Sequence, residues 1–198
     1  MPNMTEQRKS EQTRARILER GRALVLERGF GGVGLKGILA AADVPKGSFY
    51  YYFPSKEAFG CALLEGYVTE YVAALDAIIA LPQPAATRME RYFNGALGTE
   101  AATMADRCLV VKLAAEIADL SEDMRQILDA GVAQVCTRLS ALLREGAEDG
   151  SVALQSDPER SGAMLYAQWL GAAIHAKLSR NRLPLEQAME DTRARFFT

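Results

Sequence analysis

The sequence predicts an all-α protein of about nine helices, and three observations predict this fold class. Apolar residues recur at intervals of three and four, the spacing that places them on one side of a helix. Prolines fall between these segments, where helices begin or end. No stretch of the 198 residues alternates β-branched and polar residues between hairpin turns, as strands do. With 49% hydrophobic residues, the chain can bury a full core.

The first three predicted helices lie close together at the N-terminal end. A one-sided apolar stripe marks the first helix, and Gly29 is expected to end it in the left-handed conformation. A glycine-rich stretch, 31–34, is expected to be flexible and to lead into a short second helix, which Asp43 and Pro45 end. The three predicted spans are about 11–28, 35–42 and 46–52.

Six further helices are predicted after Ser55, which can cap the first of them. Asp157 offers a capping carboxylate and Pro158 suits the first helical position, so a helix start is expected there. We expect two domains, 1–56 and 57–198. The six predicted spans are about 56–80, 85–103, 108–120, 121–146, 157–180 and 185–197.

Basic residues gather near the N-terminus, although the formal net charge is −2. Residues 1–56 contain ten Lys or Arg and five Asp or Glu, whereas residues 57–198 contain 13 and 20. Such segregation favours a small module for a polyanion joined to a larger body that does not bind one. On charge alone, a chance distribution of surface charge is an equal alternative.

Two short helices joined by a tight turn after a longer helix are the helix-turn-helix arrangement, whose last helix enters the DNA major groove. Phe49 and Phe53 are four residues apart and are expected to face the core, but three adjacent tyrosines cannot all point inward. Gly47 would allow close approach to the duplex. The candidate donors to bases and phosphates are Lys46, Ser48, Tyr50, Tyr51 and Tyr52.

Two other classes of protein compete with a DNA-binding regulator. An enzyme is disfavoured because the chain contains no P-loop, no G-x-S-x-G elbow, no H-E-x-x-H and no dinucleotide fingerprint. A helical scaffold that binds only protein would leave the basic N-terminal charge and the tyrosine cluster unexplained. A salt-dependent assay on duplex DNA separates the scaffold from the regulator.

The segment 38–57, ILAAADVPKGSFYYYFPSKE, resembles the signature of the TetR family of transcriptional repressors. The resemblance runs in register from about residue 13 to residue 59. It implies a homodimeric repressor whose three N-terminal helices bind double-stranded operator DNA and whose helical body binds a small-molecule effector. One departure is Leu35, where the family often has threonine. By position, Lys46, Gly47 and Tyr51 would lie nearest the bases, and Tyr50, Tyr52 and Lys56 would meet phosphates.

The helical body is similar to one branch of this family, associated with reactive electrophiles and unsaturated acids. The similarity lies in segments 107–116, 120–125 and 169–180. It implies an effector sensed near Cys108. The other candidate effector contacts are Lys177, Trp169 and His175, for which a helix-end lysine, a packed tryptophan and a structural histidine are the alternatives.

Cys108 is the candidate sensor among the three cysteines. It falls at an expected helix start, where unpaired N–H groups and the helix dipole favour a thiolate; Arg107 adds a positive charge and Asp106 opposes it. The alternatives are an inert buried thiol and a reversibly bound effector in the same body. Cys61 and Cys136 lie inside amphipathic segments and are expected to fill the core.

Composition also bounds the cofactors, location and assembly. Three distant cysteines and a single histidine cannot make a zinc site of the usual spacing, so no metal or other cofactor is predicted. No apolar run approaches the ~18 residues of a membrane span, and the start resembles no secretory signal, so a cytoplasmic protein without membrane contact is expected. Ala163, Ala167 and Gly171 are spaced by four, which favours a homodimer joined through a four-helix bundle of segments 157–180 and 185–197.

Overall fold

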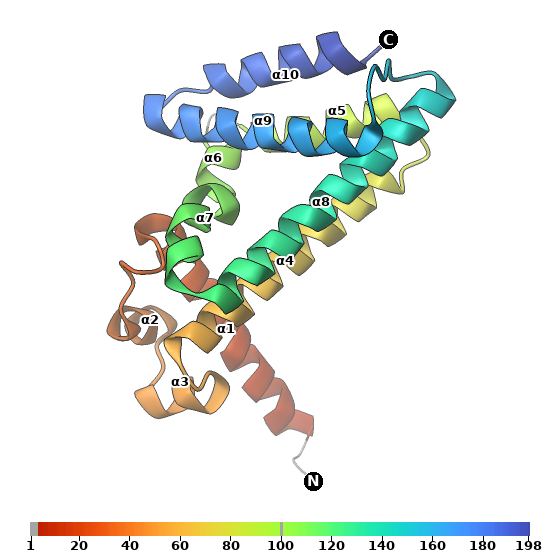
Figure 1. Cartoon of the computed structure of the whole chain (residues 1–198). Coiled ribbons are helices and arrows are strands. Elements are labelled where there is room, and N and C mark those ends of the chain that lie inside the picture. Colours follow the sequence, from red (N-terminus) through yellow and green to blue (C-terminus); the bar gives the residue numbers. More distant parts are fainter. Residues whose placement is uncertain (1–3, 100) are drawn as a thin grey trace. The chain divides into compact units, whose positions relative to one another are not determined.

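The computed structural model describes residues 4–99 and 101–198, and ten α-helices make up its regular structure (Figure 1). The predicted all-α class is confirmed. Two compact units share the chain: one contains the residues up to Tyr67 together with Lys112–Leu128, and the other contains Val68–Val111 and Asp129–Thr198. The helices are α1 (Met4–Arg28), α2 (Leu35–Ala42), α3 (Lys46–Tyr52), α4 (Lys56–Ile79), α5 (Ala85–Leu97), α6 (Met104–Arg107), α7 (Leu109–Leu120), α8 (Glu122–Asp149), α9 (Pro158–Ser179) and α10 (Leu183–Phe196).

The first unit is built around a small aromatic and aliphatic core. Ile17 and Val25 of α1, Ile38 of α2 and Phe49 of α3 are all fully buried, as is Phe59 of α4. The apolar stripes that predicted these helices are therefore the surfaces that pack together. This core holds α2 and α3 against α1 and fixes which face of α3 is left to solvent.

The ends of the N-terminal helices follow local backbone chemistry. Gly29 has φ +79°, which confirms the predicted left-handed end of α1. Asp43 ends α2 with φ +51°, and its N–H donates to the Ala40 carbonyl. The prediction that α1 begins near Glu11 was wrong, because the helix begins at Met4. The preceding Glu, Gln, Arg and Lys residues are good helix formers although they carry no apolar stripe.

The second unit has one continuous hydrophobic core. Trp169 of α9 is its largest fully buried residue and stacks on Phe93 of α5 with ring centroids 4.5 Å apart. The Trp169 Nε1–H donates to Thr192 Oγ1 of α10 over 3.1 Å, so the buried indole is satisfied. Asp157 caps α9 by accepting the Arg160 N–H, with Pro158 at the start of the helix, as predicted.

A short extra helix, α6, raises the number of helices from the predicted nine to ten within the described residues. The helix predicted over 85–103 ends at Leu97, and Gly98 follows with φ +65°; residue 100, inside that predicted span, lies outside the described residues. Thr103 and Asp106 then form a capping box that starts the four-residue α6. This helix is specified by its cap and has no apolar stripe long enough to reveal it.

Candidate functional site

The short helix α3 has two faces of opposite character. Phe49 is buried against Phe53 and Phe59, with ring centroids 5.4 and 5.7 Å away, which confirms the predicted core face. Tyr51 is 77% exposed, and Tyr50 is exposed beside it. The predicted DNA-contacting residues of α3 all lie outside this core: Lys46, Gly47, Tyr50 and Tyr51 are exposed, and Ser48 and Tyr52 are half-buried.

Several contacts order the exposed side chains of α3. The Tyr52 hydroxyl accepts a hydrogen bond from Ser10 Oγ of α1 over 3.1 Å, and the Tyr52 ring meets the Tyr51 ring edge-on at 4.9 Å. The Lys46 ammonium lies 5.8 Å from the Tyr50 ring centroid. A Cβ added at Gly47 would enter open space, so the backbone there is accessible from outside. The helix thus presents a polar, aromatic surface with accessible backbone, as a major-groove helix requires.

Lys56, a predicted phosphate contact, also supports the turn between α1 and α2. Its Nζ donates to the Phe30 carbonyl over 2.7 Å and lies 4.5 Å from the centroid of the Phe30 ring. Burial lowers the pKa of Lys56, and the nearby Glu116 carboxylate opposes that shift. The phosphate role stays a prediction, and the structure adds a role inside the protein.

Sequence reasoning missed Glu116 of α7, which contacts the same turn. Its carboxylate accepts the backbone N–H of Phe30 over 3.2 Å and also that of Gly31. Four residues earlier on α7, Lys112 Nζ donates to the Glu27 carbonyl over 3.2 Å. The partners lie about 85 positions apart in the chain, so no local pattern could have paired them.

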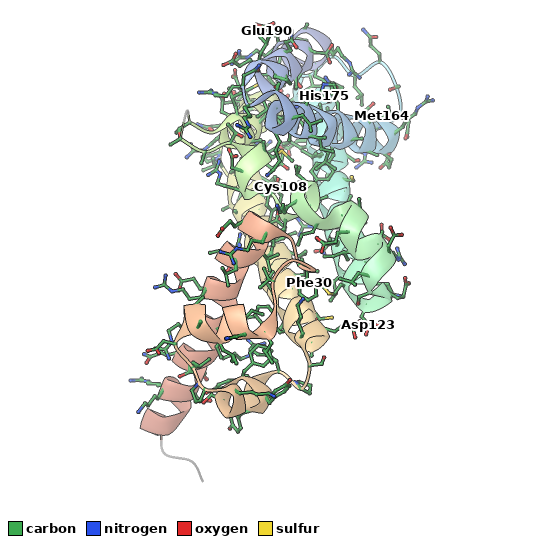
Figure 2. The ribbon with its side chains drawn as sticks, turned by 90° about the vertical axis from the view of Figure 1, so that its left-hand side faces the viewer. Phe30, Cys108, Asp123, Met164, His175 and Glu190 are labelled. Carbon is green, nitrogen blue, oxygen red and sulfur yellow. The ribbon has the colours of Figure 1, made fainter. Side chains whose placement is uncertain are left out.

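Cys108 lies in the core of the second unit, at the junction of two helices. It is the residue after α6 and the residue before α7, and it is only 4% exposed (labelled in Figure 2). The predicted start of a helix at this point is correct to within one residue. Cys108 therefore occupies the position just before the first turn of α7, the end of a helix at which N–H groups have no partner within the helix.

Three tyrosines lie close enough to Cys108 to interact with it electrostatically, and no local sequence pattern predicts this cluster: Tyr92 and Tyr166 are buried, and Tyr71 is half-buried. The hydroxyls of Tyr71 and Tyr92 are 2.7 Å apart. Burial raises the pKa of Tyr71 to about 12, and a negative charge on the Cys108 sulfur adds to that shift. Burial likewise raises the pKa of Tyr92 and of Tyr166, again with a contribution from Cys108. These phenol groups therefore stay protonated at neutral pH, and one of the two hydroxyls of Tyr71 and Tyr92 donates to the other.

The charged neighbours of Cys108 in sequence are occupied elsewhere. Asp106 accepts the Thr103 N–H in the capping box, and Arg107 donates to the carbonyls of Gly95 and Thr103. The sequence predicts that the Arg107 charge lies beside the thiol. The structure instead directs this guanidinium to the carbonyl end of α5.

The other three predicted effector residues lie on α9 in different environments. Lys177 is exposed, and its Nζ donates over 2.7 Å to the carbonyl of Ala105, three residues before Cys108. Trp169 belongs to the same buried core as Cys108. His175 is exposed (labelled in Figure 2) and lines a shallow depression between α9 and α10. The lining residues of this depression are Gln168, Gly171, Ala172, His175, Pro184, Gln187 and Ala188.

Cys61 and Cys136 are half-buried instead of filling the core completely. Burial raises the pKa of the Cys136 thiol. Burial also raises the pKa of the Cys61 thiol, and the carboxylates of Asp123, Glu57 and Glu65 add to this shift. Both thiols are therefore less ionised near neutral pH than an unperturbed cysteine.

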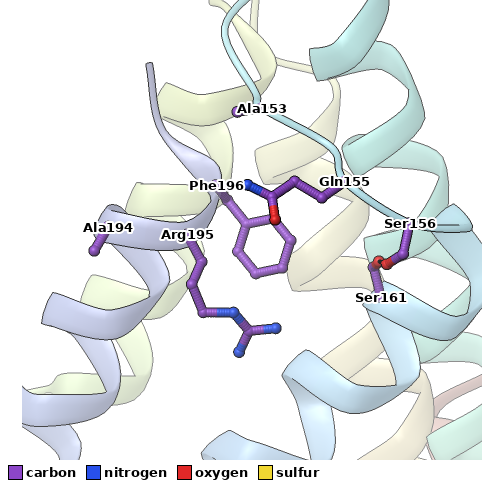
Figure 3. A pocket seen from close by; sticks show the side chains of 7 residues that line it. All are labelled: Ala153, Gln155, Ser156, Ser161, Ala194, Arg195 and Phe196. Atoms are coloured by element: carbon purple, nitrogen blue, oxygen red, sulfur yellow. Dashed lines mark hydrogen bonds between the residues drawn. The ribbon is translucent and has the colours of Figure 1, made fainter.

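A second pocket lies where α9 begins and α10 ends (Figure 3). The hydroxyls of Ser156 and Ser161 are 2.8 Å apart there, so each has a partner. None of the predicted effector residues lines this pocket. Its lining residues are Ala153, Gln155, Ser156, Ser161, Ala194, Arg195 and Phe196. Across the described residues, no group of three or more His, Cys, Asp or Glu side chains is placed to hold a metal ion, and no helix is long and apolar enough to cross a membrane.

The three-helix N-terminal unit with its exposed α3 defines a helix-turn-helix DNA-binding protein joined to a larger helical body. Residues 17–59 match the family described as bacterial regulatory proteins, tetR family, and residues 85–192 match the tetracyclin repressor-like C-terminal domain. The chain belongs to the TetR family, and it is a DNA-binding transcriptional repressor.

Its relatives support this assignment over nearly the whole chain. The transcriptional repressor NemR of Escherichia coli is 42% identical over 180 residues, which span 89% of this chain and 90% of NemR. The transcriptional regulator AcuR of Cereibacter sphaeroides is 36% identical over 159 residues, 79% of this chain and 72% of AcuR. The crystal structure of reduced E. coli NemR superimposes with a TM-score of 0.88 at 40% identity, covering 94% of this chain and 98% of that one. These relatives are transcriptional regulators and not enzymes.

Proposed function

We propose that the protein is a homodimeric cytoplasmic repressor that leaves its operator when an electrophilic small molecule modifies Cys108. The observation that carries the proposal is the place of Cys108, a buried thiol immediately before α7 that interacts electrostatically with three tyrosines. A relative of this chain, NemR, is a repressor whose crystal structure is described as a reduced form.

The proposed chemistry is addition of the thiolate to an electron-poor alkene. The Cys108 sulfur forms a carbon–sulfur bond with the alkene carbon, the alkene electron pair moves to the neighbouring carbonyl as an enolate, and the enolate takes a proton from water. The added group has no room in a packed core, so the start of α7 must shift. A differential of a few kcal/mol between the two states, about 100-fold in operator affinity, is enough to empty an operator.

Cysteine-to-serine variants test this assignment with N-ethylmaleimide as the probe. Operator release is expected for the unmodified sequence and for Cys61→Ser and Cys136→Ser, whose thiols have raised pKa values in the parent. Cys108→Ser should bind the operator with the affinity of the parent and should stay bound when N-ethylmaleimide is added. A full response in Cys108→Ser would overturn the covalent mechanism and favour a reversibly bound effector in the same helical body. The operator for this assay comes from selection of bound sequences out of random duplex DNA.

The dimer is proposed to form through α9 and α10. Ala163, Ala167 and Gly171 are exposed along one face of α9, and a Cβ added at Gly171 would meet open space. Large apolar side chains are exposed on the same helix, among them Leu178 at 79% and Ile174 at 46%. Small residues permit close approach of a second helix, and the large ones supply area to bury.

A two-fold dimer would present two α3 helices to successive major grooves, so a pseudo-palindromic operator is expected with half-sites about one helical turn apart. Ala167→Arg places a charge in the middle of the proposed interface and should produce monomers at micromolar concentration, whereas Ala114→Arg, on an exposed site of α7, should not. Sedimentation equilibrium measures both. A parent protein that is monomeric at that concentration would overturn the proposed dimer.

A further inference from the structure

The turn between α1 and α2 is held by side chains that come from outside the helix-turn-helix. Glu116 accepts the N–H groups of both Phe30 and Gly31, a two-point contact of a carboxylate with adjacent backbone amides. Hydrogen bonds to an ionised acceptor are stronger than those between neutral groups. One side chain of α7 therefore fixes the backbone at the point where the chain leaves α1.

The glycines of this turn leave space for the carboxylate. A Cβ added at Gly31 would lie 2.8 Å from Glu116 Oε1, and a Cβ at Gly29 would lie 2.8 Å from Oε2. Real Cβ atoms do not approach other atoms that closely, so a side chain at either position would displace Glu116. The turn sequence and Glu116 thus fit one another, which a chance surface contact would not require.

Two lysines hold the same segment from other directions. Lys112 donates to the Glu27 carbonyl in the last turn of α1, and Lys56 donates to the Phe30 carbonyl. Amides and carbonyls of one short segment are therefore bound by three charged side chains, two of them on α7. The turn sets the direction in which α2 begins, and α2 in turn carries α3.

We propose that Glu116 is a positioning residue for operator binding: through its bonds to Phe30 and Gly31 it sets the orientation of α2 and α3. This role of Glu116 goes beyond the proposed sensing function, and it is tested on protein that has not been treated with an electrophile. A failure here would leave the Cys108 proposal standing, and failure of the Cys108 proposal would leave this one standing.

Charge gives the test its direction. Removing a negative charge from a protein that binds DNA should strengthen binding slightly, because phosphate repulsion falls. Glu116→Gln is expected to do the reverse and weaken operator binding by about 10-fold, because a neutral amide holds two N–H groups less firmly than a carboxylate. Asp119→Asn is the matched control, since Asp119 is exposed on the same helix and carries the same charge. It should bind as tightly as the parent or slightly more tightly.

Operator affinity is measured by fluorescence anisotropy well below the melting temperature, and amide hydrogen exchange is followed at Phe30 and Gly31. A merely structural role for Glu116 would lower the melting temperature and leave the affinity of folded protein unchanged. The proposal would be overturned if Glu116→Gln bound the operator as tightly as Asp119→Asn and the amides of Phe30 and Gly31 still exchanged slowly.

A double-mutant cycle adds a second measurement with a conservative change. Gly31→Ala alone should weaken operator binding because its Cβ displaces the Glu116 carboxylate. In a protein that already carries Glu116→Gln, Gly31→Ala should lower operator affinity clearly less than it does alone, because the contact is already weakened. Strict additivity of the two losses would refute coupling between Glu116 and the turn and so overturn the proposal.

Discussion

Residues on the two faces of α3 should respond to substitution in opposite ways, and Tyr51 offers the sharpest case. Its side chain is 77% exposed and has one ring contact, edge-on to Tyr52 at 4.9 Å. Tyr51→Ala should therefore change the free energy of unfolding by no more than about 0.5 kcal/mol. Its effect on DNA should be larger, about 1–3 kcal/mol at the preferred operator, if the ring contacts base edges.

Phe49→Leu is the matched change on the buried face of the same helix. Phe49 is fully buried and has ring contacts with Tyr50, Phe53 and Phe59 at 5.4–5.7 Å. Each aromatic contact contributes about 0.5–1.5 kcal/mol beyond the area that it buries, so the substitution should cost about 2–3 kcal/mol of unfolding free energy. The folded fraction should keep the base preference of the parent.

Urea unfolding followed by circular dichroism measures stability, and anisotropy titrations with a panel of operator variants measure base preference. Tyr51→Phe separates the hydroxyl from the ring. Tyr51→Ala that weakens binding to every sequence equally would refute a base contact and assign Tyr51 to the phosphate backbone. A loss of stability larger than that of Phe49→Leu would refute the assignment of the two faces.

Three further outcomes are expected. Lys56→Met should lower the slope of log affinity against log salt concentration by about one, as the loss of a phosphate contact does. It should also lower the melting temperature, because the Phe30 carbonyl loses its hydrogen-bond donor at 2.7 Å. An unchanged slope would mean that Lys56 has only its role inside the protein. The pKa of Tyr71 is raised to about 12 in the folded state, whereas in the unfolded chain it is about 10. The free energy of unfolding should therefore be highest below pH 10 and should fall as the pH rises from about 10 to about 12. Urea unfolding between pH 8 and 12 measures this decline, which Tyr71→Phe should reduce. Trp169→Phe should cost about 1–2 kcal/mol in urea unfolding, because the Nε1 bond to Thr192 and part of the stacking on Phe93 are lost; no change would contradict the burial of the indole.

The helices were predictable wherever their signals are local. Apolar spacing located α2 and α3 to the residue, and the Asp157 cap with its following proline located the start of α9. Two of the departures from the predicted helices have different causes. The first turns of α1 form because their residues favour helix without any apolar stripe, and α6 forms because Thr103 and Asp106 cap it. Periodicity carries no information about either.

The exposed face of α3 was predictable from the sequence, and the surroundings of Cys108 were predictable only in part. Alternation of core and surface within seven residues is a local property, so the exposed tyrosines could be foreseen. The tyrosines around Cys108 come from α4, α5 and α9, which only tertiary folding brings together. For Arg107, in contrast, the sequence predicts a contact that the structure does not contain. It adjoins Cys108 in sequence, but its guanidinium bonds the Gly95 carbonyl, because a side chain's direction depends on backbone geometry that one sequence does not reveal.

The glycine-rich stretch after α1 shows how composition alone can suggest the wrong physical role. Glycines at 31, 32 and 34 suggested flexibility, yet the Val33 side chain is buried and its N–H donates to the Phe30 carbonyl over 3.3 Å. Gly29 adopts the left-handed conformation that ends α1, and Gly31 leaves room for the Glu116 carboxylate. Glycine here provides a backbone angle at one position and space at another. The backbone angle at Gly29 and the space at Gly31 together allow one fixed turn, and in our proposal this turn sets the orientation of α2 and α3.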